Sequence, residues 1–225
     1  MNGSFSPRLE VLPPAQRRFW PELAAVPIEF VLYGGTAIAL QLGHRQSVDF
    51  DFFGSQSFDP ARLETSIPFI AGAAITQRGP NTLTAIVERD GPVRLSFFGL
   101  PRLSRVSAPR VAPDNGLQVA ALLDLAGTKA SVVQQRAEAK DYIDLDAILR
   151  EGHIALPNAL AAAQAIYGTQ FNPQITLKAL SFFEDGNLGR LPRAVKDHLA
   201  KAARDVDLDS LPPMTVVGPG NLGSI

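Results

Sequence analysis

Cysteine is absent from the 225 residues of this chain. Disulfide bridges and thiolate metal sites are therefore excluded, and a reducing compartment is permitted. Long apolar runs are also absent, so no stretch is expected to span a bilayer and we expect no membrane partner. The first residues lack the basic segment and apolar core of a signal peptide, which makes a cytoplasmic protein the expectation.

Net charge is almost absent as well, because 21 lysines and arginines offset 22 aspartates and glutamates to leave −1 at pH 7. No overall field therefore draws the protein toward nucleic acid or anionic membranes, although local basic patches are compatible with this balance. The remaining composition is typical of a globular protein, with 46% apolar and 19% charged residues. A chain of this length can bury a sizeable core, in one large domain or two small ones.

The first half of the chain alternates short apolar runs with helical patterns. Residues 30–33 form an apolar run that ends at a glycine, and residues 48–53 alternate in side-chain character, so both favour strands. Asp90–Gly91, between two β-rich runs, predicts a hairpin. We expect strands at 30–33, 48–53, 82–89 and 92–98, helices at 16–25, 35–42 and 60–67, and a loose arm at 1–14.

After Pro113 the pattern becomes helical, and prolines mark the starts of three segments. We expect helices at 117–136, 139–149, 157–167, 173–183 and 192–206. The sequence therefore predicts an α+β fold in which a mixed β-sheet domain precedes a C-terminal helical bundle. The predicted boundaries are 1–113 for the sheet domain, 114–210 for the helical domain and 211–225 for a flexible tail rich in proline and glycine.

Two acidic residues, Asp49 and Asp51, interrupt the most apolar part of the first half. Residues two apart on a strand leave the same face, so both carboxylates share one face while Phe50 and Phe52 enter the core. Neighbouring carboxylates repel each other unless a positive charge neutralises them. Mg²⁺, held partly by substrate phosphates, supplies such a charge, so we predict a Mg²⁺ site at Asp49 and Asp51.

Two glycines, Gly34 and Gly35, separate the strand at 30–33 from the helix that follows. Glycine lets phosphate oxygens approach the backbone, and the helix start offers unpaired N–H groups and the positive end of the dipole. Thr36 adds a hydroxyl donor. The alternatives are a plain turn for the glycines, an exposed polar face for the aspartates and an ion pair between Arg45 and one aspartate. Taken jointly, the order and spacing favour a polyphosphate and metal site.

In this order the residues resemble a known family. Gly34–Thr36 followed by residues 44–53 (HRQSVDFDFF) is similar to the signature of the AbiEii-type nucleotidyltransferases, which belong to the DNA-polymerase-β-like nucleotidyltransferase superfamily. Lys129, Arg136 and residues 140–145 (KDYIDL) resemble the second block of that family. The similarity extends over about residues 30–149, and the helical C-terminal half also fits.

The resemblance implies a Mg²⁺-dependent transfer of a nucleotidyl group from a nucleoside triphosphate to an acceptor. Several members are toxins of bacterial toxin–antitoxin or phage-defence systems with a cognate antitoxin, and some modify the acceptor end of tRNA. It also implies roles for particular residues. These are nucleotide binding by Gly34, Gly35, Thr36, Arg45, Ser47 and Lys129, metal binding by Asp49 and Asp51, and catalysis by Asp49, Asp51, Lys129 and Asp141.

Lysine is missing from the first 128 residues, where every residue with a fixed positive charge is arginine. Lys129 lies near the apolar stripe of the expected 117–136 helix, where a lysine needs an anion. The alternative is that its head group reaches solvent along the helix surface. Asp141 and Asp144 lie three apart on the next helix and share a face. For them the alternative is an ion pair with Arg136 or another cation.

Ser96 departs from the pattern of the superfamily, which commonly places a third carboxylate on a later strand. Glu88 on the preceding strand is a candidate substitute. Without a third acid the chain could keep the fold and bind a nucleotide or a partner without catalysis. Phosphoryl transfer is a further alternative to nucleotidyl transfer, because the same binding of metal and phosphate serves both reactions.

Overall fold

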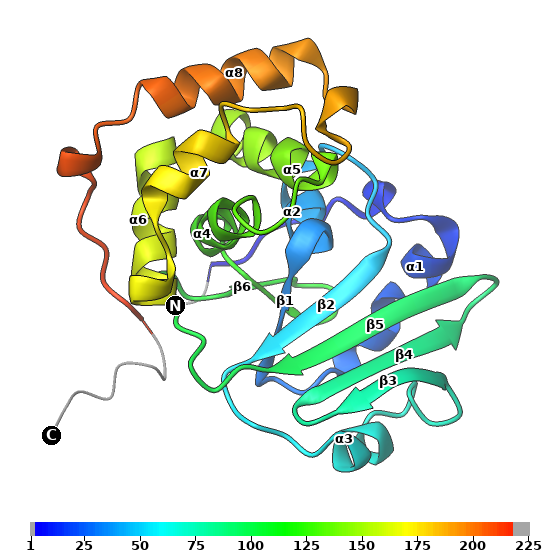
Figure 1. Ribbon diagram of the computed structural model, residues 1–225. Coiled ribbons are helices and arrows are strands. Elements are labelled where there is room, and N and C mark those ends of the chain that lie inside the picture. The colour runs from blue at the N-terminus through cyan, green and yellow to red at the C-terminus, as the bar shows by residue number, and fades with distance from the viewer. Residues whose placement is uncertain (1–2, 218–225) are drawn as a thin grey trace, which may run out of the picture. The chain divides into compact units, whose positions relative to one another are not determined.

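The computed structural model describes residues 3–217 and divides into two compact units (Figure 1). Unit 1 comprises residues 3–103 and 108–121, and unit 2 comprises residues 104–107 and 122–217. Of the predicted tail over 211–225, residues 218–225 lie outside the described residues. Val217 pairs with Arg105 in an isolated antiparallel bridge within unit 2.

Unit 1 is built on a mixed seven-stranded sheet with the order β3-β4-β5-β2-β1-β7-β6 (Figure 1). β2 is antiparallel to β1 and parallel to β5, while β3, β4 and β5 form an antiparallel meander. The strands are β1 (Phe30–Tyr33), β2 (Asp49–Gly54), β3 (Ala74–Gly79), β4 (Thr82–Glu88), β5 (Pro92–Gly99), β6 (Arg110–Val111) and β7 (Gln118–Val119). The predicted α+β class is confirmed.

The central strand β2 has one apolar and one acidic face, as its alternation predicts. Phe50 and Phe52 are fully buried. The ring of Phe52 stacks on that of Phe97 at 4.9 Å, and Phe19 packs against Phe50 with ring centroids 6.3 Å apart. Asp49, on the opposite face, is only half-buried. The same strand therefore supplies the core and a polar surface.

The α-helices in the described part of unit 1 are α1 (Pro14–Phe19), α2 (Gly34–Leu42) and α3 (Pro60–Ser66). Asp59 caps α3, since its carboxylate accepts a hydrogen bond from Ala61 N at 3.0 Å. Gly43 ends α2 in the left-handed region, with φ of +77°, and its N–H donates to Ala39 O. Both helix boundaries agree with the prediction.

The N-terminal arm is not loose, so this prediction is wrong for residues 3–14. Phe5, Val11 and Leu12 are buried. Arg8 N donates to Leu40 O at 2.8 Å, which ties the arm to α2. Burial of these apolar side chains holds the arm in place despite its prolines.

Unit 2 contains the helices α4 (Leu122–Val132), α5 (Ala139–Arg150), α6 (Leu156–Tyr167), α7 (Pro173–Ala179) and α8 (Arg193–Arg204) (Figure 1). α4 packs closely on α6 at Gly127, where a Cβ atom would come within 2.9 Å of Ala163 N. None of the helices in residues 3–217 is long and apolar enough to cross a membrane.

The main difference from the predicted elements concerns the expected helix at 117–136. Residues 118–119 instead form β7, parallel to β1, and Ala120 N donates to Leu32 O at 2.9 Å. Pairing with β1 therefore holds these residues in an extended conformation, and α4 starts only at Leu122. Strand β3 was not predicted because its side chains are mostly polar and exposed, without an alternating pattern.

Phe52→Ala is expected to lower the free energy of unfolding of unit 1 by about 3–5 kcal/mol, because it leaves a cavity beside Phe97. Ile28→Ala is the control, since Ile28 is 77% exposed and its loss should change stability by less than about 0.5 kcal/mol. Urea titration followed by fluorescence of Trp20, the single tryptophan, reports unit 1. Equal effects of the two changes would contradict the assigned core.

Candidate active site

Asp49 and Asp51 lie on one face at the start of β2. The register places Asp51 opposite Tyr33 on β1 and opposite Ser96 on β5, while Asp49 lies opposite Arg94. Adjacent strands are about 4.8 Å apart, so these side chains are neighbours. The two carboxylates are therefore bordered by the buried Tyr33 and Ser96 and by the exposed Arg94.

The glycine turn lies directly beside Asp51. Gly34 follows Tyr33 with φ of +72°, a conformation that favours glycine. A Cβ atom at Gly34 would lie only 3.0 Å from Asp51 Oδ2, so a side chain here would press on the carboxylate. Glycine is therefore required for its conformation and for the space that Asp51 occupies.

The start of α2 lies beside the acidic pair and carries backbone N–H groups. The helix begins at Gly34, and Tyr33 at the N-cap position makes no side-chain hydrogen bond to it. The first N–H groups of a helix have no intrahelical partner, and the dipole makes this end positive. The turn therefore suits an anion next to the acidic pair, provided that a cation separates the two.

Thr36 and Ser47 are both buried and anchor the start of β2 to α2. Thr36 Oγ1 donates to Asp49 O at 2.5 Å and lies 2.8 Å from Ser47 Oγ. This pair fixes the backbone of Asp49 relative to the first turn of α2. Their direct contact with a nucleotide stays a prediction.

Arg45 lies in the loop before β2 and donates a hydrogen bond to Gln46 O at 2.8 Å.

Ser96 occupies the position on β5 that a third acid would take. It is buried opposite Asp51, and Thr84 Oγ1 lies 3.4 Å from its hydroxyl. Glu88 cannot supply the missing acid, because it pairs with Pro92 next to the turn that joins β4 and β5. It lies two strands away from Asp49 and about 7 Å farther along the sheet. The suggestion that Glu88 substitutes for the missing acid is therefore wrong.

Arg94 was not among the predicted site residues. It is exposed and lies opposite Asp49 in the parallel pairing of β2 with β5. Its guanidinium supplies a positive charge at the edge of the acidic pair, where it suits a phosphate oxygen. The alternation of Arg94 and Ser96 with buried residues indicates that both lie on the polar face of β5. The sequence does not indicate that Arg94 pairs with Asp49 on the neighbouring strand.

The two aspartates fit Mg²⁺. Among residues 3–217 no group of three His, Cys, Asp or Glu side chains could enclose a metal ion. Mg²⁺ does not need such an enclosure, because it commonly takes one or two carboxylates and completes its shell with water and substrate phosphates. Asp49 and Asp51 would hold it, next to the glycine turn at Gly34.

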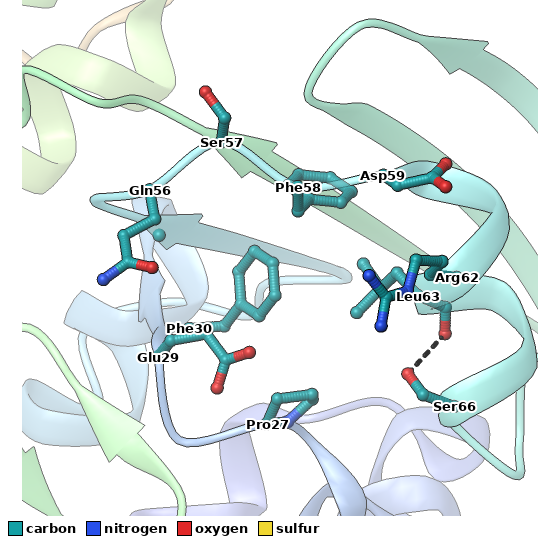
Figure 2. A pocket seen from close by; sticks show the side chains of 11 residues that line it. Pro27, Glu29, Phe30, Gln56, Ser57, Phe58, Asp59, Arg62, Leu63 and Ser66 are labelled. Carbon is teal, nitrogen blue, oxygen red and sulfur yellow. Dashed lines mark hydrogen bonds between the residues drawn. The ribbon is translucent and has the colours of Figure 1, made fainter.

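A separate cavity of about 380 Å³ lies at the other end of β1 and β2 (Figure 2). Phe30 and Gly54, which pair at that end, contribute to its wall, and Glu29 and Arg62 reach toward it from different segments. It contains none of the predicted site residues. This cavity is therefore distinct from the acidic pair.

In unit 2 the second group of predicted residues forms a buried ion cluster. Lys129 Nζ lies 2.6 Å from Asp141 Oδ1 and 2.7 Å from Asp144 Oδ2. The Asp141 and Asp144 side chains are fully buried and that of Lys129 is 7% exposed. Lys129 therefore does not extend to solvent, and the anion that its position requires is a pair of aspartates. Asp144 was not predicted as a site residue.

Arg136 joins the cluster from the loop between α4 and α5. Its Nε donates to Asp141 Oδ2 at 2.7 Å, so the predicted alternative of an ion pair with Arg136 holds as well. Burial alone would raise the pKa of Asp141, but the bonds from Arg136 and the charge of Lys129 hold the pKa below its usual value. Asp141 is therefore an anion throughout the physiological range.

A further buried carboxylate, Asp124, lies in the first turn of α4. Its Oδ1 accepts a hydrogen bond from Val106 N at 2.9 Å, while Oδ2 has no hydrogen-bond partner among the described residues. Burial raises the pKa of Asp124 to about 6, and the bonds from the 106–107 backbone oppose this only in part. Asp124 thus holds residues 104–107 on unit 2 at a cost in desolvation.

The predicted site residues therefore fall into two groups. Gly34, Gly35, Thr36, Arg45, Ser47, Asp49 and Asp51 belong to unit 1, and Lys129 and Asp141 belong to unit 2. In unit 1 the structure places Gly34 beside Asp51 and Thr36 beside Ser47. In unit 2 it joins Lys129 to Asp141.

Comparison with known proteins places the chain in a family. Residues 22–213 match the family described as "Nucleotidyl transferase AbiEii toxin, Type IV TA system". The chain belongs to the AbiEii nucleotidyltransferase toxin family. An uncharacterized protein of Aquifex aeolicus (strain VF5) is 31% identical over 159 residues, which is 70% of this chain and 75% of that protein.

The AbiEii assignment also agrees with the fold. MenT4, a nucleotidyltransferase toxin of Mycobacterium tuberculosis H37Rv, has a similar structure with a TM-score of 0.58 and 18% identity. The similarity covers 89% of this chain and 84% of MenT4. MenT4 therefore shares the fold, and it is the AbiEii family match over residues 22–213 that makes this protein a nucleotidyltransferase of a toxin family, as its sequence motifs predicted.

Lys129→Met is expected to lower the free energy of unfolding of unit 2 by about 3–5 kcal/mol, because it leaves two fully buried carboxylates without their shared cation. Adding Asp144→Asn should restore part of the loss by removing one charge. Lys201→Met, at an exposed lysine, is the control. The measurement is urea unfolding followed by helical circular dichroism, and a loss below about 1 kcal/mol would contradict the cluster.

Asp124→Asn is expected to stabilise the protein above pH 6. The folded-state pKa of about 6 exceeds the unfolded value of about 3.9, so the folded state binds more protons between these limits. Wild-type stability therefore falls as pH rises from about 4 to 6, by about 3 kcal/mol for this group. Asparagine does not titrate and can still accept from Val106 N.

The check is the difference in free energy of unfolding between Asp124→Asn and wild type at several pH values. The difference should favour the variant at pH 7.5 and shrink toward pH 4. A difference that does not vary with pH would rule out the raised pKa.

Proposed function

We propose that this AbiEii protein transfers a nucleotidyl group from a nucleoside triphosphate to an acceptor RNA, such as the acceptor end of a tRNA, with Mg²⁺ at Asp49 and Asp51. One observation carries the proposal: Asp51 Oδ2 lies 3.0 Å from the position of a Cβ at Gly34, so the acidic pair and the glycine turn lie side by side. Mg²⁺, when bound there, would neutralise the phosphates and polarise the reacting one.

In this reaction an acceptor hydroxyl oxygen attacks the α-phosphorus. The new P–O bond forms as the bond to the β-phosphate oxygen breaks, pyrophosphate leaves, and the hydroxyl proton passes to solvent. The N–H groups at the start of α2 would hold the departing phosphates, and Arg94 beside Asp49 would hold a further phosphate oxygen. Positioning and charge stabilisation of this kind are the main contributions of a protein to phosphoryl chemistry.

Thr36 and Ser47 act in this proposal by positioning. Their bonds fix the backbone at Asp49, so that its carboxylate and that of Asp51 keep their separation. Lys129 and Asp141 form a rigid charged cluster in unit 2. A nucleotide phosphate would meet Lys129 only if it displaced one of the two aspartates that hold the lysine.

The biological role in this proposal is that of a toxin that depends on a cognate antitoxin. Modification of an RNA acceptor end would block translation and would in this way make the protein toxic. Phosphoryl transfer to the acceptor is the competing reaction, because the same metal and glycine turn would grip the γ-phosphate. The two differ in which phosphorus atom reaches the RNA.

Asp49→Asn and Asp51→Asn are each expected to lower transfer of label from an α-labelled triphosphate to RNA by at least about 100-fold in the presence of Mg²⁺. Glu88→Gln is the matched control, because it removes an exposed carboxylate from the same sheet without touching the pair. It should leave the rate unchanged.

The same assay distinguishes the alternatives. Transfer from γ-labelled but not α-labelled triphosphate would identify a phosphotransferase, and binding of triphosphate without transfer would identify a non-catalytic protein. A wild-type rate for Asp49→Asn would eliminate the proposed metal site.

A further inference from the structure

A pocket of about 290 Å³ lies in unit 2, between the end of α4, helix α7 and the loop that follows α7. Its wall includes Arg136, Tyr142, Ile175, Lys178, Phe182 and Asp185. The volume is at the lower end of the range for small-molecule pockets, roughly 300 Å³. It suits one base or a similar flat group, whereas a protein partner usually covers about 800 Å² on each side.

The pocket has rigid walls. Thr176 is fully buried, and its hydroxyl donates to Ala130 O at 2.8 Å, which fixes α7 on α4. On the other side, Gly186 has φ of +55° and lies against Ala137 O, and Asn187 Oδ1 accepts from Ala139 N at 2.6 Å. The loop that carries Phe182 and Asp185 is therefore joined to the start of α5.

Two large apolar side chains are exposed in this pocket. Phe182 is 49% exposed and Ile175 is 47% exposed. In the described part of unit 2 the one other exposed large hydrophobic residue is Val217. An exposed aromatic ring in a preformed pocket is a stacking platform for nucleobases, which all carry a π face.

Two cations line the same pocket as the ring. Arg136 and Lys178 are exposed on the wall, against the one carboxylate of Asp185. Arg136 also donates to Asp141, so the pocket wall continues into the cluster at Lys129. The pocket therefore combines positive charge, an aromatic surface and a direct link to the charged cluster of the same unit.

We propose that this pocket holds one nucleotide from the single-stranded end of the acceptor RNA. The base stacks on Phe182, the adjacent phosphates lie at Lys178 and Arg136, and Asp185 accepts a hydrogen bond from an exocyclic amino group. Cytosine, adenine and guanine each carry an exocyclic amino group, whereas uracil carries none, so the pocket disfavours uracil. As an acceptor pocket it rests on the proposed function.

Binding of short fluorescent oligo(C) and oligo(U) RNA without triphosphate tests the pocket by anisotropy. Phe182→Ala and Phe182→Leu should each weaken oligo(C) binding about 10-fold or more, while Phe182→Trp retains it, because stacking needs an aromatic face. Lys178→Ala should reduce the slope of log affinity against log salt by about 0.7. Asp185→Asn should abolish the preference for oligo(C) over oligo(U).

Ile28→Ala is the control, since it removes an exposed hydrophobic residue from unit 1. Oligo(C) affinity unchanged by both Phe182→Ala and Phe182→Leu would overturn the proposal. So would a loss of self-association in Phe182→Ala by sedimentation with RNA binding intact, which would make the pocket a protein contact.

The nucleotidyl-transfer assay separates this proposal from the proposed function. If wild type labels RNA and Phe182→Ala labels it equally at limiting RNA, the pocket is wrong and the function stands. If no RNA is labelled by wild type while oligo(C) binding still depends on Phe182, the function is wrong and an RNA-binding pocket stands.

Discussion

The structure of unit 1 depends on the alternation of strand β2. Phe50 and Phe52 fill the core from one face, and Asp49 and Asp51 leave from the other. The burial of two phenylalanines thus holds two like charges beside each other, at a separation set by the strand repeat. Because the same six residues specify both core and site, the acids cannot move apart without disturbing the packing beneath them.

Much of unit 1 follows from local signals in the sequence. The strand alternation, the glycine after Tyr33 and the Asp59 cap each act within a few residues, so they can be read without the fold. Arg94 could not be predicted in the same way, because its position beside Asp49 depends on the parallel register of two strands more than 40 residues apart in sequence. The capture of residues 118–119 by β1 is non-local for the same reason, since backbone pairing at a sheet edge overrides a helical pattern.

In unit 2 the partners of the buried charges could not be predicted from the sequence either, because they lie on different helices. The sequence indicates that Lys129 needs an anion and that Asp141 and Asp144 share a face, but their partners were left open. The structure joins them in one cluster in which a single lysine serves two buried aspartates and Arg136 serves one of them. Such a cluster is costly to desolvate and strongly destabilised by the loss of one member, so it favours a single arrangement of α4 and α5.

The distribution of lysine gives the molecule a built-in chemical asymmetry. All five lysines lie after residue 128, in unit 2, and Lys129 is the one whose amine is enclosed by carboxylates. Reagents that modify lysine amines, such as acylating labels and crosslinkers, therefore react with side chains of unit 2 and with none of the side chains of unit 1. The rate at which Lys129 reacts, compared with the rates of the exposed Lys140 and Lys178, therefore reports whether the buried cluster has opened to solvent.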